Sequence, residues 1–111
     1  MKIAITGHTK GIGKALYDNL SEQHEVEGYS RSNGFDISNN VDIIVRAAKK
    51  SDVFINNAFY AMAQMILLNR FWDLWKYDET KTIVNISSLS KYPGLSGNEN
   101  GYSAMKAALS H

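Results

Sequence analysis

The segment that decides the fold is Thr6–Gly13 (TGHTKGIG), which directly follows the apolar run Lys2–Ile5 (KIAI). A short run of this kind is typical of a central parallel strand buried on both faces. Glycine permits a tight turn and lets the pyrophosphate of a dinucleotide approach the backbone, because a Cβ would clash there. Apolar residues at helical spacing begin right after the turn. The segment therefore predicts a strand, a phosphate-binding turn and a helix N-terminus, and the alternative is a glycine-rich turn without a ligand.

The rest of the chain alternates between strand and helix patterns. Further strands are expected at 26–30, 52–55 and 82–86, and helices at 12–20, after a cap at Ser38 or Asn39, at 58–76 and from 101 onward. This alternation predicts an α/β fold with a parallel sheet and right-handed crossovers. The 111 residues correspond to one domain, 1–111.

Composition excludes several classes of protein. The formal net charge is +1 with both signs interspersed, so neither nucleic acid nor a membrane is expected as a partner. Without cysteine there is no disulfide or thiolate metal site, and no metal site is predicted. The amino-terminal residues do not resemble a signal peptide, and no apolar stretch is long enough to span a bilayer. A cytoplasmic location is expected.

The end of the second strand indicates which dinucleotide is preferred. An acidic residue there would accept the ribose hydroxyls of NAD(H) and repel a 2′-phosphate. The sequence instead reads Gly28-Tyr29-Ser30-Arg31, and Lys10 stands before the second glycine of the turn. Arg31 can hold a phosphate as a forked donor. NADP(H) is therefore favoured and NAD(H) is possible, unless both cations are ordinary solvated surface residues.

Three further patterns follow along the chain: Asn56-Asn57-Ala58, then Val84–Ser88 (VNISS), then Tyr102-x-x-x-Lys106. With the glycine turn and Asp36-Ile37-Ser38, this order resembles the short-chain dehydrogenase/reductase family in its classical branch. The resemblance extends from Lys2 to about Leu109. It implies a Rossmann-like three-layer α/β/α fold with a small parallel sheet in an order resembling 3-2-1-4-5. It also implies hydride transfer between a nicotinamide cofactor and a carbonyl or alcohol substrate.

The resemblance assigns roles residue by residue. The catalytic residues would be Ser88, Tyr102 and Lys106. Together with Lys10 and Arg31, which were assigned above from their charge, the cofactor-binding residues would be Gly7, Thr9, Gly11, Ile12, Gly13, Ser30, Asp36, Ile37, Asn57, Ala58, Tyr102 and Lys106. The chemistry is consistent with these residue types, because an ammonium group four positions from a tyrosine shares its helix face and lowers the phenol pKa. Tyr102 would then exchange a proton with the substrate oxygen.

The chain also departs from the family pattern. Phe59 replaces a glycine after Asn-Asn-Ala, and the segment between Arg31 and Asp36 is compressed, with room for only a short fifth strand near Phe35. Family members continue well beyond the tyrosine helix, so the chain is expected to be a shortened member without a substrate loop. Only one helix is then expected on one face of the sheet. The helix at 58–76 is apolar almost all the way round, and a homo-oligomer, dimer or tetramer, would cover both surfaces.

Two alternatives to an enzyme stay open. The chain is either a non-catalytic dinucleotide-binding module, or a truncated remnant of the family that only assembles or binds. The intact Ser88, Tyr102 and Lys106 favour the enzyme. The roles of Asn69, in the helix at 58–76, and of His8, in the glycine turn, are left undetermined, as are the substrate and the reaction direction.

Overall fold

The computed structural model describes residues 1–60 and 62–86. The helix expected from 101 lies outside the described residues, as do Ser88, Tyr102 and Lys106.

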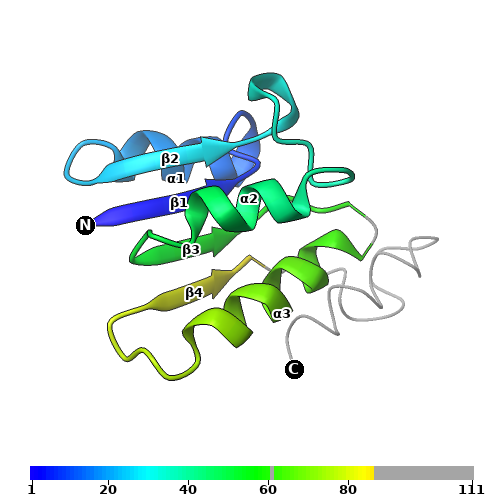
Figure 1. Ribbon diagram of the computed structural model, residues 1–111. Helices are drawn as coiled ribbons and strands as arrows, with labels where there is room; N and C mark the ends of the chain where they lie inside the picture. Colours follow the sequence, from blue (N-terminus) through cyan, green and yellow to red (C-terminus); the bar gives the residue numbers. More distant parts are fainter. Residues whose placement is uncertain (61, 87–111) are drawn as a thin grey trace, which may run out of the picture.

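Four parallel strands form one sheet (Figure 1): β1 (Lys2–Thr6), β2 (Glu25–Tyr29), β3 (Val53–Asn56) and β4 (Thr82–Asn85). Their order is β2-β1-β3-β4, and every neighbouring pair is parallel. This confirms the predicted α/β fold, with the strand order expected for the family once its third strand is left out. Within the described residues no strand forms near Phe35, because the chain there makes the 3₁₀ turn η1 (Arg31–Asn33) and then leads into the next helix.

Three helices in the described part of the chain cover the sheet unequally. These are α1 (Gly11–Leu20), α2 (Val41–Ala48) and α3 (Ala63–Trp75). α1 lies on one face, while α2 and α3 lie side by side on the other, called here the α2/α3 face (Figure 1). Among the described elements, α1 is alone on its face, as the sequence predicts.

The apolar core is divided by the sheet in the same unequal way. On the α2/α3 face, Phe54 of β3 stacks on Phe71 of α3 with ring centroids 3.9 Å apart, and Ile44 and Leu67 are fully buried beside them. On the α1 face the buried cluster consists of Ile3, Ile5 and Ile55. Among the described residues, burial of apolar area on the α2/α3 face therefore supplies most of the hydrophobic stabilisation.

Two predicted helix starts differ from the structure, that of α3 by five residues and that of α2 by one or two. The third helix begins at Ala63 rather than at residue 58. The N–H groups of Asn57 and Ala58 donate to Thr6 Oγ1 (both 3.1 Å), which ties the segment before the helix to the end of β1. Neither Ser38 nor Asn39 caps α2, which begins after Asn40. Ser38 instead donates its hydroxyl to Asp36.

The outer edge of β2 is partly closed by one side chain. Asn33 of η1 donates from its amide nitrogen to the carbonyl oxygen of Gly28 (2.7 Å), and its amide oxygen accepts from the N–H of Ser30 (2.8 Å). The Asn33 amide thus occupies the place of a peptide group on a neighbouring strand.

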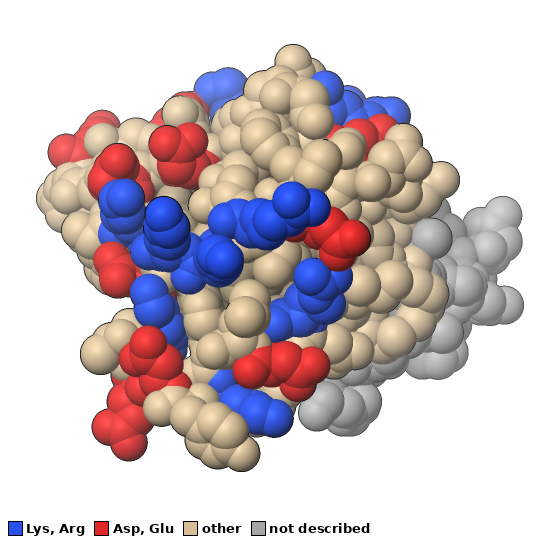
Figure 2. All heavy atoms as spheres, viewed as in Figure 1, with Lys and Arg blue, Asp and Glu red and all other residues tan. Residues whose placement is uncertain are grey.

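The surface of the α2/α3 face carries acidic and basic side chains close together (Figure 2).

Candidate functional site: a cleft at the carboxyl ends of the strands

Because all strands run parallel, the ends of β1, β2 and β3 meet at one edge of the sheet. A cleft of about 820 Å³ lies there, within the range typical of small-molecule and cofactor sites. Nine of the predicted cofactor residues line it: Gly7, Thr9, Lys10, Ser30, Arg31, Asp36, Ile37, Asn57 and Ala58. The lining also includes residues that the sequence did not single out for this role, namely Tyr29, Ser32, Phe35 and Tyr60, and it includes Phe59.

The glycine turn has a conformation that favours glycine. Gly7 has φ +71° and Gly11 has φ +57°, a region that residues with a Cβ rarely adopt. Gly13 is required for a different reason, because a Cβ there would lie 2.0 Å from the carbonyl oxygen of Gly7. Gly13 therefore lets α1 pack directly against the turn, while Gly7 keeps the turn tight.

The turn is tied to the end of β3 by a buried threonine. Thr6 is fully buried, and its hydroxyl accepts from the N–H groups of Asn57 and Ala58. Asn57 in turn donates from Nδ2 to the carbonyl oxygen of Gly7 (3.0 Å). Both cleft-lining segments are thus fixed relative to each other before any ligand binds, which lowers the entropic cost of binding.

The N-terminus of α1 opens at the same edge. Its N-cap residue, Lys10, makes no side-chain capping hydrogen bond, and the first turn contains no acidic residue. The first N–H groups of a helix have no intrahelical partner and attract anions. The predicted cofactor residues Gly11, Ile12 and Gly13 do not line the cleft themselves; Ile12 is 62% exposed and Gly13 is buried in the packing of the turn.

Charge in the cleft comes from three side chains. Lys10 and Arg31 are both exposed and both line it. Asp36 accepts hydrogen bonds from the backbone N–H (2.9 Å) and the hydroxyl (2.8 Å) of Ser38. These bonds, the backbone one foremost, hold the pKa of Asp36 below its usual range, so the carboxylate is ionised at neutral pH.

His8 belongs to the turn but does not line the cleft. Its ring lies against Gly28, where a Cβ would come within 2.3 Å of the imidazole, and its centroid is 4.9 Å from that of Tyr17. Burial lowers the pKa of His8, and its Nδ1 is buried without a hydrogen-bond partner among the described residues. His8 therefore packs between β2 and α1 rather than facing a phosphate.

A buried polar cluster joins the ends of β3 and β4. Gln64, fully buried at the start of α3, donates from Nε2 to the carbonyl oxygens of Asn56 (2.9 Å) and Ile86 (3.2 Å). Asn56 donates from Nδ2 to the backbone of Gln64 (2.8 Å) and to the side chain of Asn85 (3.0 Å). The cluster fixes the chain just before Ser87 and Ser88. The sequence did not indicate this role of Gln64. Its only sign there is that a polar residue interrupts the apolar face of a helix.

Other predicted residues do not enter the cleft. Asn69 lies on the exposed side of α3 and does not line it. The roles assigned to Ser88, Tyr102 and Lys106 stay predictions, because these residues lie outside the described part. Within that part, no helix has the length and apolar character needed to cross a membrane.

Comparison with known proteins supports the fold. No protein-family model and no curated protein sequence matches this chain. Among solved structures it is similar to the 3-alpha-hydroxysteroid dehydrogenase from Pseudomonas sp. B-0831, solved in complex with NADH, with a TM-score of 0.59 and 20% sequence identity. The match covers 98% of this chain and 57% of that protein, so this chain spans little more than half of that enzyme's length. The likeness shows that the chain has the fold of that dehydrogenase over the matched region.

Proposed function

We propose that this chain binds a nicotinamide dinucleotide in the cleft and is an oxidoreductase of the short-chain dehydrogenase/reductase type. The observation that carries the proposal is the glycine turn, in which Gly7 and Gly11 have positive φ and lead into an uncapped helix N-terminus beside a cleft of about 820 Å³. The NADH bound by the steroid dehydrogenase of the same fold supports it.

The residues present fit such a cofactor. The turn and the first N–H groups of α1 would hold the pyrophosphate, since no acid of the first turn competes for them. A Cβ at Gly11 would meet nothing within 4 Å, so the glycine there serves the backbone conformation alone. Asp36 and Ile37, which line the cleft beyond β2, would contact the adenosine portion.

NADP(H) is the favoured form of the cofactor, and NAD(H) is the alternative. No acidic residue follows β2 directly, and Arg31 lies in the cleft with Ser30 and Ser32 beside it. A guanidinium and hydroxyl groups at this point suit a 2′-phosphate.

The reaction would be reduction of a carbonyl or oxidation of an alcohol. The bound nicotinamide would supply or accept the hydride. Tyr102 would donate or accept the proton at the substrate oxygen, Ser88 would hydrogen-bond the same oxygen, and Lys106 would favour the phenolate of Tyr102. Gln64 fixes Ile86, two residues before Ser88, through the hydrogen bond to its carbonyl oxygen.

Calorimetric titration with NADPH and with NADH tests the cofactor proposal. We expect saturable binding, tighter for NADPH. Arg31→Gln should weaken NADPH about tenfold or more and leave NADH nearly unchanged, because a charge-assisted bond to phosphate is lost. Arg46→Gln is the matched control, since Arg46 is an exposed arginine of α2 outside the cleft. Absence of any heat or thermal shift with either dinucleotide would refute the proposal.

Turnover distinguishes an enzyme from a binding module. With NADPH and a panel of small carbonyl compounds, the parent protein should consume NADPH. Tyr102→Phe should abolish this while NADPH affinity is kept. Binding without turnover by the parent protein would favour the non-catalytic module, and activity surviving in Tyr102→Phe would show that Tyr102 is not the proton donor.

We also propose that the chain acts as a homo-oligomer in the cytoplasm. Large apolar side chains of α3 face solvent, with Ile66 45%, Leu74 50% and Trp72 57% exposed. α1 is also alone on its face within the described residues. Apolar surface of this kind is usually covered by a partner, and a second copy in a symmetric contact is the simplest one.

A further inference from the structure

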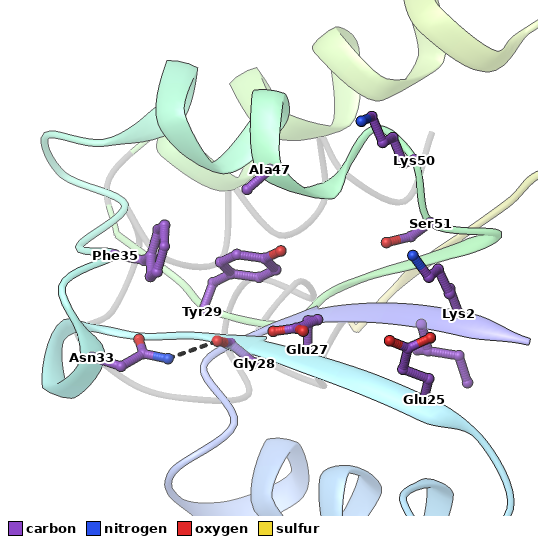
Figure 3. Close-up of a pocket in the computed structure, with 11 residues that line it drawn as sticks. Lys2, Glu25, Glu27, Gly28, Tyr29, Asn33, Phe35, Ala47, Lys50 and Ser51 are labelled. Atoms are coloured by element: carbon purple, nitrogen blue, oxygen red, sulfur yellow. Dashed lines mark hydrogen bonds between the residues drawn. The ribbon is translucent and has the colours of Figure 1, made fainter.

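A second pocket lies on the α2/α3 face at the outer edge of the sheet, between β2 and α2 (Figure 3). Its volume is about 350 Å³. The rings of Tyr29 and Phe35, which meet edge to face with centroids 4.8 Å apart, line both this pocket and the cleft described above. The pocket is otherwise formed by different residues, so it is separate from the proposed cofactor site.

Two hydroxyl groups of mostly buried residues open into this pocket. Tyr29 is 5% exposed and Ser51 is 7% exposed. The backbone of Ser51 is satisfied, since its N–H donates to Ala48 (2.9 Å) and its carbonyl oxygen accepts from Lys81 (2.7 Å). Neither hydroxyl has a hydrogen-bond partner among the described residues, and both oxygens face the interior of the pocket in Figure 3. Both hydroxyls are open to the pocket, so each is free to exchange a water for a polar group of a ligand.

Four charged side chains surround the hydroxyls. The amines of Lys2 and Lys50 lie on the side of Ser51, and the carboxylates of Glu25 and Glu27 rise from β2 (Figure 3). None of the four forms an ion pair within the described residues. All four are exposed, and Lys2 lies opposite Glu25 in the register of β1 and β2, so the rim of the pocket carries both signs with no net charge.

We propose that this pocket binds a free amino acid, with its carboxylate at the hydroxyls of Tyr29 and Ser51 and the amines of Lys2 and Lys50, and its ammonium group at Glu25 and Glu27.

A zwitterion matches the pocket better than a simple ion does. An anion alone would satisfy the lysines and hydroxyls but would sit beside two unpaired carboxylates, and a cation alone would leave the lysines unpaired. An amino acid pairs both signs, and charge-assisted hydrogen bonds of this kind are the strong ones. The carbon skeleton would contact Ala47 and the ring of Phe35. The volume is at the low end of ligand pockets, as suits a molecule of this size.

NMR titration of the ¹⁵N-labelled protein tests the proposal without any dinucleotide. The probes are L-alanine, L-glutamine and L-phenylalanine, which differ in side-chain size and polarity. We expect at least one to shift the amide signals of Glu27, Gly28, Lys50 and Ser51 in a saturable way. Acetate and methylammonium, each carrying one of the two charges, should bind more weakly than that amino acid.

Substitutions of pocket residues test whether the amino acid binds at this site. Ser51→Ala and Lys50→Gln should each weaken the best probe about tenfold, because each removes one hydrogen-bond donor to its carboxylate. Lys49→Gln is the matched control, since Lys49 is exposed but does not line the pocket. The amide spectrum itself reports whether each variant is folded. The proposal is overturned by a lack of saturable shifts with all three probes, by acetate binding as tightly as the amino acid, or by unchanged affinity in both pocket variants.

Discussion

At the scale of single residues, the two kinds of glycine in the turn should respond differently to substitution. A Cβ at Gly13 would lie 2.0 Å from the Gly7 carbonyl oxygen and 2.4 Å from Asn57 Nδ2. Gly13→Ala should therefore lower the free energy of unfolding by at least about 2 kcal/mol, because backbone must move. Gly11→Ala meets no atom within 4 Å and should lose only about 1 kcal/mol, from its positive φ. Urea denaturation measures both, and equal losses would contradict the packing argument.

Thr6 should be sensitive to loss of its hydroxyl rather than its shape. Thr6→Val keeps the volume but removes the acceptor for the N–H groups of Asn57 and Ala58. Leaving these partly buried N–H groups without their acceptor should cost about 1 kcal/mol, which thermal or urea unfolding would show. Thr6→Ser keeps the acceptor, so it should be the less destabilising of the two. The reverse order would mean that the methyl group matters more than the hydrogen bonds.

His8 should make stability depend on pH. Burial lowers the pKa of His8 in the folded state below its ordinary value of 6.5, so the unfolded chain takes up the proton first as the pH falls. Its neutral form is thus favoured by folding, and stability should fall as the pH drops below about 6.5 toward the lower folded pKa. His8→Gln should flatten this part of the profile, measured as the free energy of unfolding against pH. Identical slopes for parent and variant would exclude His8 as the cause.

The sequence indicates the roles of some of these residues and not those of others. The turn glycines were found because their spacing follows from how a backbone approaches a phosphate. The roles of Thr6, Gln64 and His8 depend on contacts between segments far apart in the chain, and a threonine at a strand end or a histidine in a loop looks the same with or without such a contact. Whether Ser88 and Tyr102 act as proposed remains a prediction.

At the scale of elements, α3 has one face that is buried in the core and one that is exposed. Leu67 is fully buried, and Leu67→Ala should cost about 2–5 kcal/mol of unfolding free energy by leaving a cavity. Asn69, two residues further along, is exposed, and Asn69→Ala should stay within about 0.5 kcal/mol and leave dinucleotide affinity unchanged. Chemical denaturation and calorimetry measure the two effects. A large loss in Asn69→Ala would give that residue a role that the structure does not show.

Element types were predictable, and their ends were less so. Apolar periodicity identified all four strands and the three described helices. The predicted start of α3 is five residues too early, because residues 58–62 are compatible with a helix by composition and the sequence does not show that Asn57 and Ala58 are tied to Thr6. Likewise Ser38 looks like a helix cap in the sequence, but the N–H groups of Asn39 and Asn40 donate to the carbonyl oxygen of Asp36 in a turn, and α2 begins only after Asn40.

At the scale of the whole molecule, the proposed oligomer can be tested on α3. Trp72 is 57% exposed, and Trp72→Glu would place a charge in a contact formed by this helix. We expect sedimentation to show the parent protein as a dimer or tetramer at micromolar concentration and the variant as a smaller species, since burying an unpaired charge is strongly unfavourable. Tyr77→Glu, at a site 91% exposed beyond the end of α3, is the control. A compact, stable monomer of the parent protein would refute the oligomer.

The overall arrangement followed from the sequence because alternating strands and helices leave few topologies. The strand order itself was implied by the family resemblance: 3-2-1-4-5 without its third strand is the observed β2-β1-β3-β4. The pocket beside β2 was not foreseen, since it arises where a compressed segment leaves the outer strand without a neighbour.

The side chain of Asn33 has a consequence for the behaviour of the protein in concentrated solution. An outermost strand normally offers its free peptide groups to other molecules, and stacking of such strands leads to fibrils. Here the side-chain amide of Asn33 already forms hydrogen bonds with Gly28 and Ser30 at the outer edge of β2. The exposed carboxylates of Glu25 and Glu27 repel the same carboxylates on the β2 strand of a second molecule. Asn33→Ala should therefore raise the rate of thioflavin-positive aggregation, even where the folded state is barely destabilised.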